Sequence, residues 1–293
     1  MDSAKQRRAR AEKSISNLSG SFPLELILAG LALLLLTYVL WQLPYFGDWE
    51  VVYYAAGRSV VDPYTVPGFF NAPWLAWILA PFTLFPLHLS GTLWMVLSTV
   101  VGLWCIHRLG GGIPAAALCL LSPAYIRFIT SGQVDAVPLL GFVLLLTVQE
   151  LSWAGLGIAL VLVKPQVFGA GLLTYWVNLE RKEKLFILWL PVLLLVLSFA
   201  LYGFWPLQMG WQHLTRKVDV TPWPYGIPIG LALLAWSIRQ KEPALGGFST
   251  FFLVPYASPS SVFAYTAVLF SLAPRWLSVI TFLFLWLMAL TIM

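Results

Sequence analysis

A single carboxylate stands where the first apolar stretch of the chain ends. Asp48 follows the apolar run 24–43 and precedes an aromatic stretch, 49–61, whose apolar positions repeat near helical spacing. A carboxylate in this position can act as a general base that takes a proton from a sugar or lipid hydroxyl within hydrogen-bond reach. Asp is also a favoured N-cap residue, so a second interpretation is that Asp48 only begins a helix at the membrane surface.

Two cations interrupt apolar sequence further along the chain. Lys164 precedes Pro165, and Arg127 lies in the segment 123–128. A cation in such a segment is costly unless it has a partner. Either side chain could hold a phosphate, which a lysine contacts as a point charge. Either could instead extend to a membrane interface, so both interpretations stay open.

A short polar break lies between these cations. Gln133 and Asp135 belong to the sequence Ser-Gly-Gln-Val-Asp at 131–135, which separates two apolar runs. Their side chains suit binding of polar substrate groups. They are equally compatible with a loop at the end of a helix.

The elements that must position these residues are apolar helices. Of the 293 residues, 60% are hydrophobic and 10% are charged, whereas about 25% are charged in a soluble domain. So few charges cannot cover a surface that faces water, and helices satisfy their own backbone groups in lipid. We therefore predict an all-α fold, that of a polytopic helical membrane protein.

Charge predicts how this protein lies in the membrane. Residues 1–20 are a basic tail that we expect in the cytoplasm, and residues 21–293 form a single transmembrane domain. Positive charge before a first span is typical of a cytoplasmic N-terminus. We expect a multi-pass protein of the cell membrane, in contact with membrane lipids and not with nucleic acid.

The apolar segments are numerous and several are short. We count about ten to eleven, some of only about eleven residues, below the roughly 20 needed to cross a bilayer. Pairs of short segments meet at Lys164-Pro165 and Ser258-Pro259, which predicts half-helices lining a cavity. The stretch 49–61 predicts a helix lying in the external interface. Gln133 faces the cytoplasm if 113–129 crosses fully and faces outward if it returns as a half-helix, and both remain open.

Several chemistries have no sequence signal. The chain lacks a phosphate-binding glycine loop, a dinucleotide-binding glycine fingerprint and a cluster of Cys and His residues. Cys105 and Cys119 lie in apolar runs and are interpreted as small core residues. We expect neither a metal ion nor a cofactor.

Short motifs occur along the chain in a characteristic order. They are Asp48 with Tyr53-Tyr54-Ala55-Ala56, the turn Asp62-Pro63-Tyr64, Phe69-Phe70-Asn71-Ala72-Pro73, Pro123 with Gly132-Gln133, Lys164-Pro165 before the basic loop at Arg181, and a late Ser258-Pro259. In this order they resemble glycosyltransferase family 87, a mannosyltransferase-like family of the GT-C superfamily.

The resemblance implies a GT-C-like fold and a reaction. A sugar such as mannose would pass from a polyprenyl-phosphate donor to a lipid or glycan acceptor outside the cytoplasm, with inversion and without a metal. Asp48 would be the catalytic base, and Lys164 or a neighbouring cation would contact the donor phosphate. The remaining residues of the expected substrate-binding set are Gln133, Tyr53, Tyr54, Arg127 and Asp135.

Two departures from the family pattern keep alternatives open. Members usually carry Tyr-Pro-Pro where this chain has Asn71-Ala72-Pro73, and often carry histidines after the late Ser-Pro, where this chain has Ser260-Ser261. The missing histidines favour a non-catalytic assembly or scaffold protein derived from the same fold. Half-helices and an intramembrane lysine also suit a small-solute or lipid transporter, although we find no inverted repeat.

Overall fold

A computed structural model describes residues 22–44, 46–208 and 220–292. The chain divides into two compact units, Met1–Pro44 and Tyr45–Met293. Every regular element of the described residues is a helix, which confirms the all-α prediction. The predicted basic tail, 1–20, lies outside the described residues.

The described residues of the first unit form helix α2 (Phe22–Trp41), of 20 residues. It lies close to the predicted first span, 24–43. Its sequence tolerates Pro23 because a proline in the first helical turn removes no intrahelical hydrogen bond. The rest of the fold belongs to the second unit.

Among the described residues, two helical segments are long and apolar enough to cross a membrane. They are α5 (Leu87–Arg108) and the segment Arg181–Tyr202, which comprises α11 (Arg181–Ile187) and α12 (Trp189–Tyr202). Only 22% of the apolar window in Arg181–Tyr202 is buried, so most of its apolar surface is available to lipid. These helices indicate a membrane protein.

A third candidate span is broken. Helices α6 (Ile113–Leu120) and α7 (Pro123–Ser131) meet at an angle of 60°, as a broken span or a re-entrant loop does. Ser122 accepts a hydrogen bond from the backbone N–H of Tyr125 and so caps α7 after the break. The other apolar helices of the described residues are shorter, and the count of ten to eleven segments stays a prediction.

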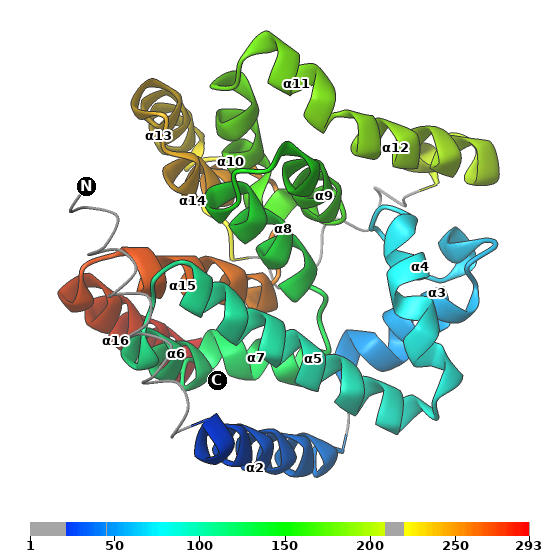
Figure 1. Ribbon diagram of the computed structural model, residues 1–293, viewed down its shortest axis with the longest axis vertical. Coiled ribbons are helices and arrows are strands. Elements are labelled where there is room, and N and C mark those ends of the chain that lie inside the picture. The colour runs from blue at the N-terminus through cyan, green and yellow to red at the C-terminus, as the bar shows by residue number, and fades with distance from the viewer. Residues whose placement is uncertain (1–21, 45, 209–219, 293) are drawn as a thin grey trace, which may run out of the picture. The chain divides into compact units, whose positions relative to one another are not determined.

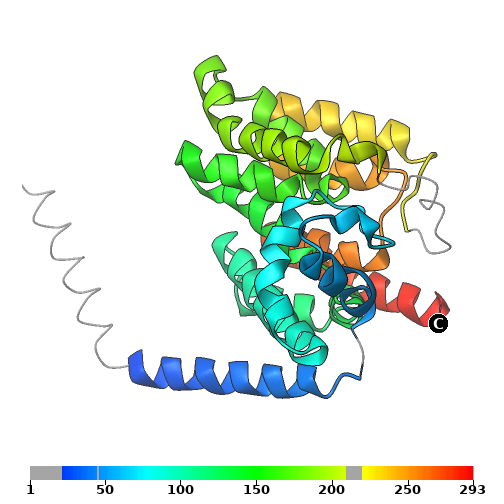
Figure 2. The same cartoon turned by 90° about the vertical axis from the view of Figure 1, so that its right-hand side faces the viewer.

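Short helices pack together through glycines. One group, seen in Figures 1 and 2, contains α8 (Ala136–Thr147), α9 (Leu151–Val161), α10 (Pro165–Val177), α13 (Ile227–Gln240) and α14 (Pro243–Leu253). A Cβ on Gly141 of α8 would lie 2.5 Å from the carbonyl oxygen of Gly157 in α9, and one on Gly171 would lie 2.7 Å from the backbone nitrogen of Gly247. Small residues let helix backbones approach this closely.

The N-terminal part of the second unit is built against α5. It comprises the π-helical turn η1 (Trp49–Tyr53), α3 (Tyr54–Arg58), the 3-10 turn η2 (Pro63–Thr65), α4 (Trp74–Leu79) and the 3-10 turn η3 (Ala80–Leu84). Trp49 stacks on Trp94 of α5 with ring centroids 5.4 Å apart. Two buried aromatic rings thereby fix η1 against α5.

The chain ends with α15 (Val262–Leu272) and α16 (Arg275–Ile292), and η4 (Trp205–Leu207) follows α12 earlier in the chain. The turn η6 (Pro259–Ser261) leads into α15 and packs against α7. It therefore brings the late Ser-Pro motif to the polar break that follows α7.

Candidate functional site

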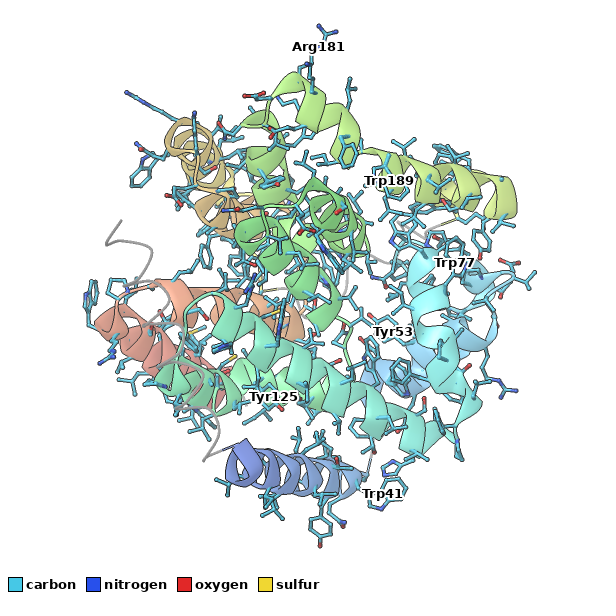
Figure 3. The ribbon with its side chains drawn as sticks, in the orientation of Figure 1. Trp41, Tyr53, Trp77, Tyr125, Arg181 and Trp189 are labelled. Atoms are coloured by element: carbon cyan, nitrogen blue, oxygen red, sulfur yellow. The ribbon has the colours of Figure 1, made fainter. Side chains whose placement is uncertain are left out.

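Asp48 and Tyr53 lie on one face of an unusual helical turn. The backbone N–H of Tyr54 bonds to the carbonyl of Trp49, a π-helical bond that spans five residues. In an α-helix, side chains five residues apart diverge by about 140°, whereas a π-helical turn stacks them. Tyr53, labelled in Figure 3, lies five residues after Asp48. Both side chains reach Gln133. The chain is helical from Trp49 to Arg58, which is shorter than the predicted helix at 49–61, and its first turn is wider than α-helical spacing implies. Its position in the membrane interface stays a prediction.

Two glycines let this turn approach the polar break. Gly132 ends α7 in the left-handed conformation, at φ 62° and ψ 40°. A Cβ there would lie 2.5 Å from Cβ of Trp49 and 2.9 Å from the carbonyl oxygen of Phe46, and a Cβ on Gly47 would lie 2.9 Å from Cα of Ser131. No larger residue fits at either position without a shift, so the glycines place Asp48 beside Gln133.

Gln133 lies at the centre of the site. Its side chain is buried, its Nε2 donates to Oδ2 of Asp48, and its Oε1 accepts from Tyr53 Oη at 3.1 Å and from Lys164 Nζ at 3.2 Å. Its backbone carbonyl accepts from Nε1 of Trp94 at 3.1 Å. Every polar group of this amide side chain therefore has a partner, and its position is fixed from three sides.

Behind Gln133 lies a buried ion pair. Lys164 Nζ is 2.7 Å from Oδ1 of Asp135, and the hydroxyl of Ser261 donates to the same oxygen at 3.1 Å. Asp135 is fully buried, and none of the described residues gives its Oδ2 a hydrogen bond. Asp135 thus supplies the opposite charge that a buried lysine needs.

The Lys-Pro break places Lys164 between two helices. Residues before proline avoid helical dihedrals, and Lys164 adopts φ −147° and ψ 71° between α9 and α10. Asn71, just before α4, and Trp74, the first residue of α4, hold this break. Asn71 Nδ2 donates to the carbonyl of Val163 at 3.2 Å, and the indole of Trp74 donates to the carbonyl of Ala159 at 3.0 Å. Asn71, a departure from the family pattern, thus has a structural role.

These side chains line an open pocket. Its empty volume is about 600 Å³, which includes its mouth. The lining is rich in aromatic, amide and hydroxyl groups, and the residues are Asp48, Val52, Tyr53, Gly68, Phe70, Asn71, Gln133, Lys164, Gln166, Tyr256 and Ser258. Aromatic faces with amides around them suit a hydroxylated group such as a sugar.

The helix-cap interpretation of Asp48 does not match this geometry. The side chain makes no capping hydrogen bond to η1, and the residue itself has helical dihedrals, φ −66° and ψ −19°. Its carboxylate instead faces Gln133 and the pocket. Asp48 is therefore held by tertiary structure in a position from which it can contact a bound molecule.

The charge balance of the site differs from that of a simple phosphate site. Within the part of the chain that the structure describes, Lys164 is the only cation in the lining, and its charge is compensated by Asp135. Asp48 adds a second carboxylate. The site therefore favours an uncharged hydroxylated group over an anion at the position nearest Asp48.

Two residues of the predicted set lie elsewhere. Tyr54 turns away from Tyr53 and donates to the carbonyl of Phe85 at 3.0 Å. Arg127 is exposed on α7 and is not among the lining residues. The other five predicted residues, Asp48, Tyr53, Gln133, Asp135 and Lys164, come together.

The prediction did not include Asn71, Gln166, Tyr256, Ser258 or Ser261 as site residues, although all lie in or beside the pocket. The late Ser-Pro was a usable signal, because a hydroxyl-rich turn between short apolar helices has no hydrophobic role. Tyr256 offers no comparable signal in the sequence.

Comparisons with known proteins add no assignment to this geometry. A scan of protein families, a search of curated proteins and a search of solved structures each found no match.

Proposed function

We propose that this protein is a membrane glycosyltransferase, which moves a sugar from a polyprenyl-phosphate donor to a hydroxyl of a lipid or glycan acceptor. The observation that carries the proposal is the position of Asp48. Its carboxylate faces an open pocket, is oriented by Gln133 and does not cap a helix. The resemblance to glycosyltransferase family 87 supplies the reaction type.

In the proposed reaction, Asp48 takes the proton of the acceptor hydroxyl as the oxygen attacks the anomeric carbon of the sugar. The bond between the anomeric carbon and the phosphate oxygen breaks, and the electron pair leaves with the polyprenyl phosphate. The new glycosidic bond forms on the opposite face, so the configuration inverts. No metal is needed in this scheme.

The lining of the pocket supports a sugar as its occupant. Tyr53, Phe70 and Tyr256 offer aromatic faces, and Asn71 and Gln166 offer amide groups. Aromatic rings bury the apolar faces of sugar rings, and amides both donate to and accept from hydroxyl groups. This combination recognises a polyol without needing a charge.

We further propose the orientation of the protein in the cell membrane. Helix α2 is its first span, the basic N-terminal tail and the loop at Arg181 and Lys182 face the cytoplasm, and the pocket opens at the outer face. The contact between Gln133 and Asp48 supports a re-entrant α6–α7 pair, because it requires both residues to lie at one depth.

Transfer from a defined donor tests this function. Purified protein in vesicles is given radiolabelled polyprenyl-phosphate mannose and a lipid extract as acceptor, and release of polyprenyl phosphate is followed. We expect release by the wild type and none above background by Asp48→Asn, which keeps the shape of the side chain and removes its basicity. Equal release by both proteins would overturn the proposal.

One observation favours a second candidate, a non-catalytic scaffold with the same fold. Among the described residues, Lys164 is the only cation that lines the pocket, and Asp135 neutralises it, so the described part of the lining offers no free cation to the leaving phosphate. A scaffold would bind a lipid-linked sugar without releasing polyprenyl phosphate. Binding of the labelled donor, with no release of polyprenyl phosphate from it whichever acceptor is added, would support this candidate.

A further inference from the structure

The orientation of one amide decides what Asp48 contacts. Oε1 of Gln133 accepts two hydrogen bonds, and its Nε2 donates to Asp48. A flip of the amide would turn Nε2 toward Lys164, which can only donate, and Oε1 toward the Asp48 carboxylate, which can only accept. Both contacts would become repulsive.

Lys164 is the group that enforces this orientation. The hydroxyl of Tyr53 can rotate to donate or accept, so it tolerates either face of the amide. The ammonium of Lys164 has no acceptor capacity and therefore selects Oε1. Its own position is fixed by Asp135 at 2.7 Å, and Ser261 holds Asp135 in turn.

We infer that Lys164 is a positioning residue that acts on Asp48 through Gln133 and is not a ligand of the donor phosphate. The buried pair with Asp135 sets Lys164, Lys164 sets the amide of Gln133, and the amide presents a donor to the base. The inference rests on the proposed function only for the role of Asp48 as base. It replaces the role in phosphate binding that the family resemblance implies for Lys164.

Two features of the pair support this assignment. Lys164 is 6% exposed and gives its two observed hydrogen bonds to Gln133 and Asp135. An ammonium neutralised by a buried carboxylate attracts a substrate anion weakly, because the anion would meet the compensating charge as well. A donor bond to the Asp48 carboxylate, by contrast, stabilises its ionised form directly.

A variant that keeps the net charge separates orientation from simple electrostatics. Lys164→Met with Asp135→Leu removes one positive and one negative charge together, and apolar replacement of a buried pair is often tolerated. Should that variant fail to fold, Lys164→Gln with Asp135→Asn carries the same prediction. A glutamine at position 164 can both donate and accept, so it tolerates either orientation of the Gln133 amide. Gln133→Glu serves as a positive control because it places a second carboxylate against Asp48.

The first readout is independent of enzyme activity. A carbodiimide modifies protonated carboxyl groups, so labelling of Asp48 across a pH series, quantified by mass spectrometry of the full-length protein after digestion, gives a midpoint. We expect the midpoint to rise by about one pH unit in the double variants and further in Gln133→Glu. The exposed carboxylate of Asp62 is an internal control that stays unchanged. The other titratable groups among the lining residues that the structure describes are Tyr53, Lys164 and Tyr256.

The second readout separates positioning from phosphate binding. With polyprenyl-phosphate mannose as donor, we expect kcat to fall about ten- to a hundred-fold in the double variants, with the KM for donor within about two-fold of wild type. A donor KM that rises ten-fold or more at unchanged kcat would assign Lys164 to the phosphate and overturn the inference.

The two readouts also separate this inference from the proposed function. A raised midpoint in a protein that transfers no sugar upholds the orienting role of Lys164 and refutes the transferase. An unchanged midpoint in the folded double variants refutes the orienting role, whatever the transfer activity.

Discussion

Gly132 holds the two halves of the site together, and its replacement by alanine has a calculable cost. The left-handed conformation at φ 62° costs a residue with a Cβ about 1–2 kcal/mol. The new Cβ would also lie 2.5 Å from Cβ of Trp49 and 2.9 Å from the carbonyl oxygen of Phe46. Relief of such an overlap typically costs a further 1–3 kcal/mol or so. We therefore expect Gly132→Ala to lose about 2–5 kcal/mol of unfolding free energy.

A matched glycine isolates the contact. Gly110 also has a positive φ, 85°, and a Cβ there meets nothing within 4 Å. Gly110→Ala should therefore lose only the unfolding free energy that the left-handed backbone costs, about 1–2 kcal/mol. The two variants are compared by reversible unfolding in mixed micelles with increasing SDS, followed by the far-UV circular dichroism signal.

Gly132→Ala should lower the rate of polyprenyl phosphate release by more than its loss of unfolding free energy alone would explain. Relief of the overlap moves Trp49 and its neighbour Asp48 away from Gln133, and a displacement of about 1 Å can cost a hundred-fold in rate. Release of polyprenyl phosphate, measured below the unfolding temperature of both variants, should fall in Gly132→Ala and stay near wild type in Gly110→Ala. Equal stability and equal activity in the two variants would refute the argument that the close approach positions the base.

Three further substitutions test the supporting contacts. Asn71→Leu removes the donor to the carbonyl of Val163, and we expect a loss of about 1–3 kcal/mol of unfolding free energy, measured in the same SDS titration. Ser261→Ala removes one of the hydrogen bonds to buried Asp135, and the same titration should show a loss of about 1.5–3 kcal/mol. Arg127→Gln should leave both stability and polyprenyl phosphate release near wild type, because its side chain is exposed and outside the pocket lining; a large loss of release would return Arg127 to the site.

Composition and the positions of the prolines predict much of this fold. The shortage of charges indicates an all-helical membrane protein, and prolines mark real breaks, such as Pro123 at the bend between α6 and α7 and Pro165 at the start of α10. These predictions succeed because proline acts locally, through its missing N–H and its effect on the preceding residue.

The site was only partly predictable, for reasons that lie in tertiary structure. Local sequence identifies Asp48 and Lys164 as unusual residues in an apolar chain, but it does not show that Gln133 lies between them. The π-helical turn also rotates Tyr53 toward Gln133 and Tyr54 toward Phe85, whereas the sequence treats the two tyrosines alike. Tyr53 and Asp48 lie 80 and 85 residues before Gln133 in the sequence. Their contacts depend on tertiary packing, which the spacing of apolar residues along the chain does not predict.

The most direct test of the central claim compares two aspartates of the same segment. Asp48 faces the pocket, whereas Asp62 is exposed and serves as the control. With saturating polyprenyl-phosphate mannose and acceptor, we predict that kcat in Asp48→Asn falls about a hundred- to ten-thousand-fold, the range expected for loss of a general base, while Asp62→Asn keeps wild-type kcat. A kcat for Asp48→Asn within a few-fold of the Asp62→Asn value would contradict the account.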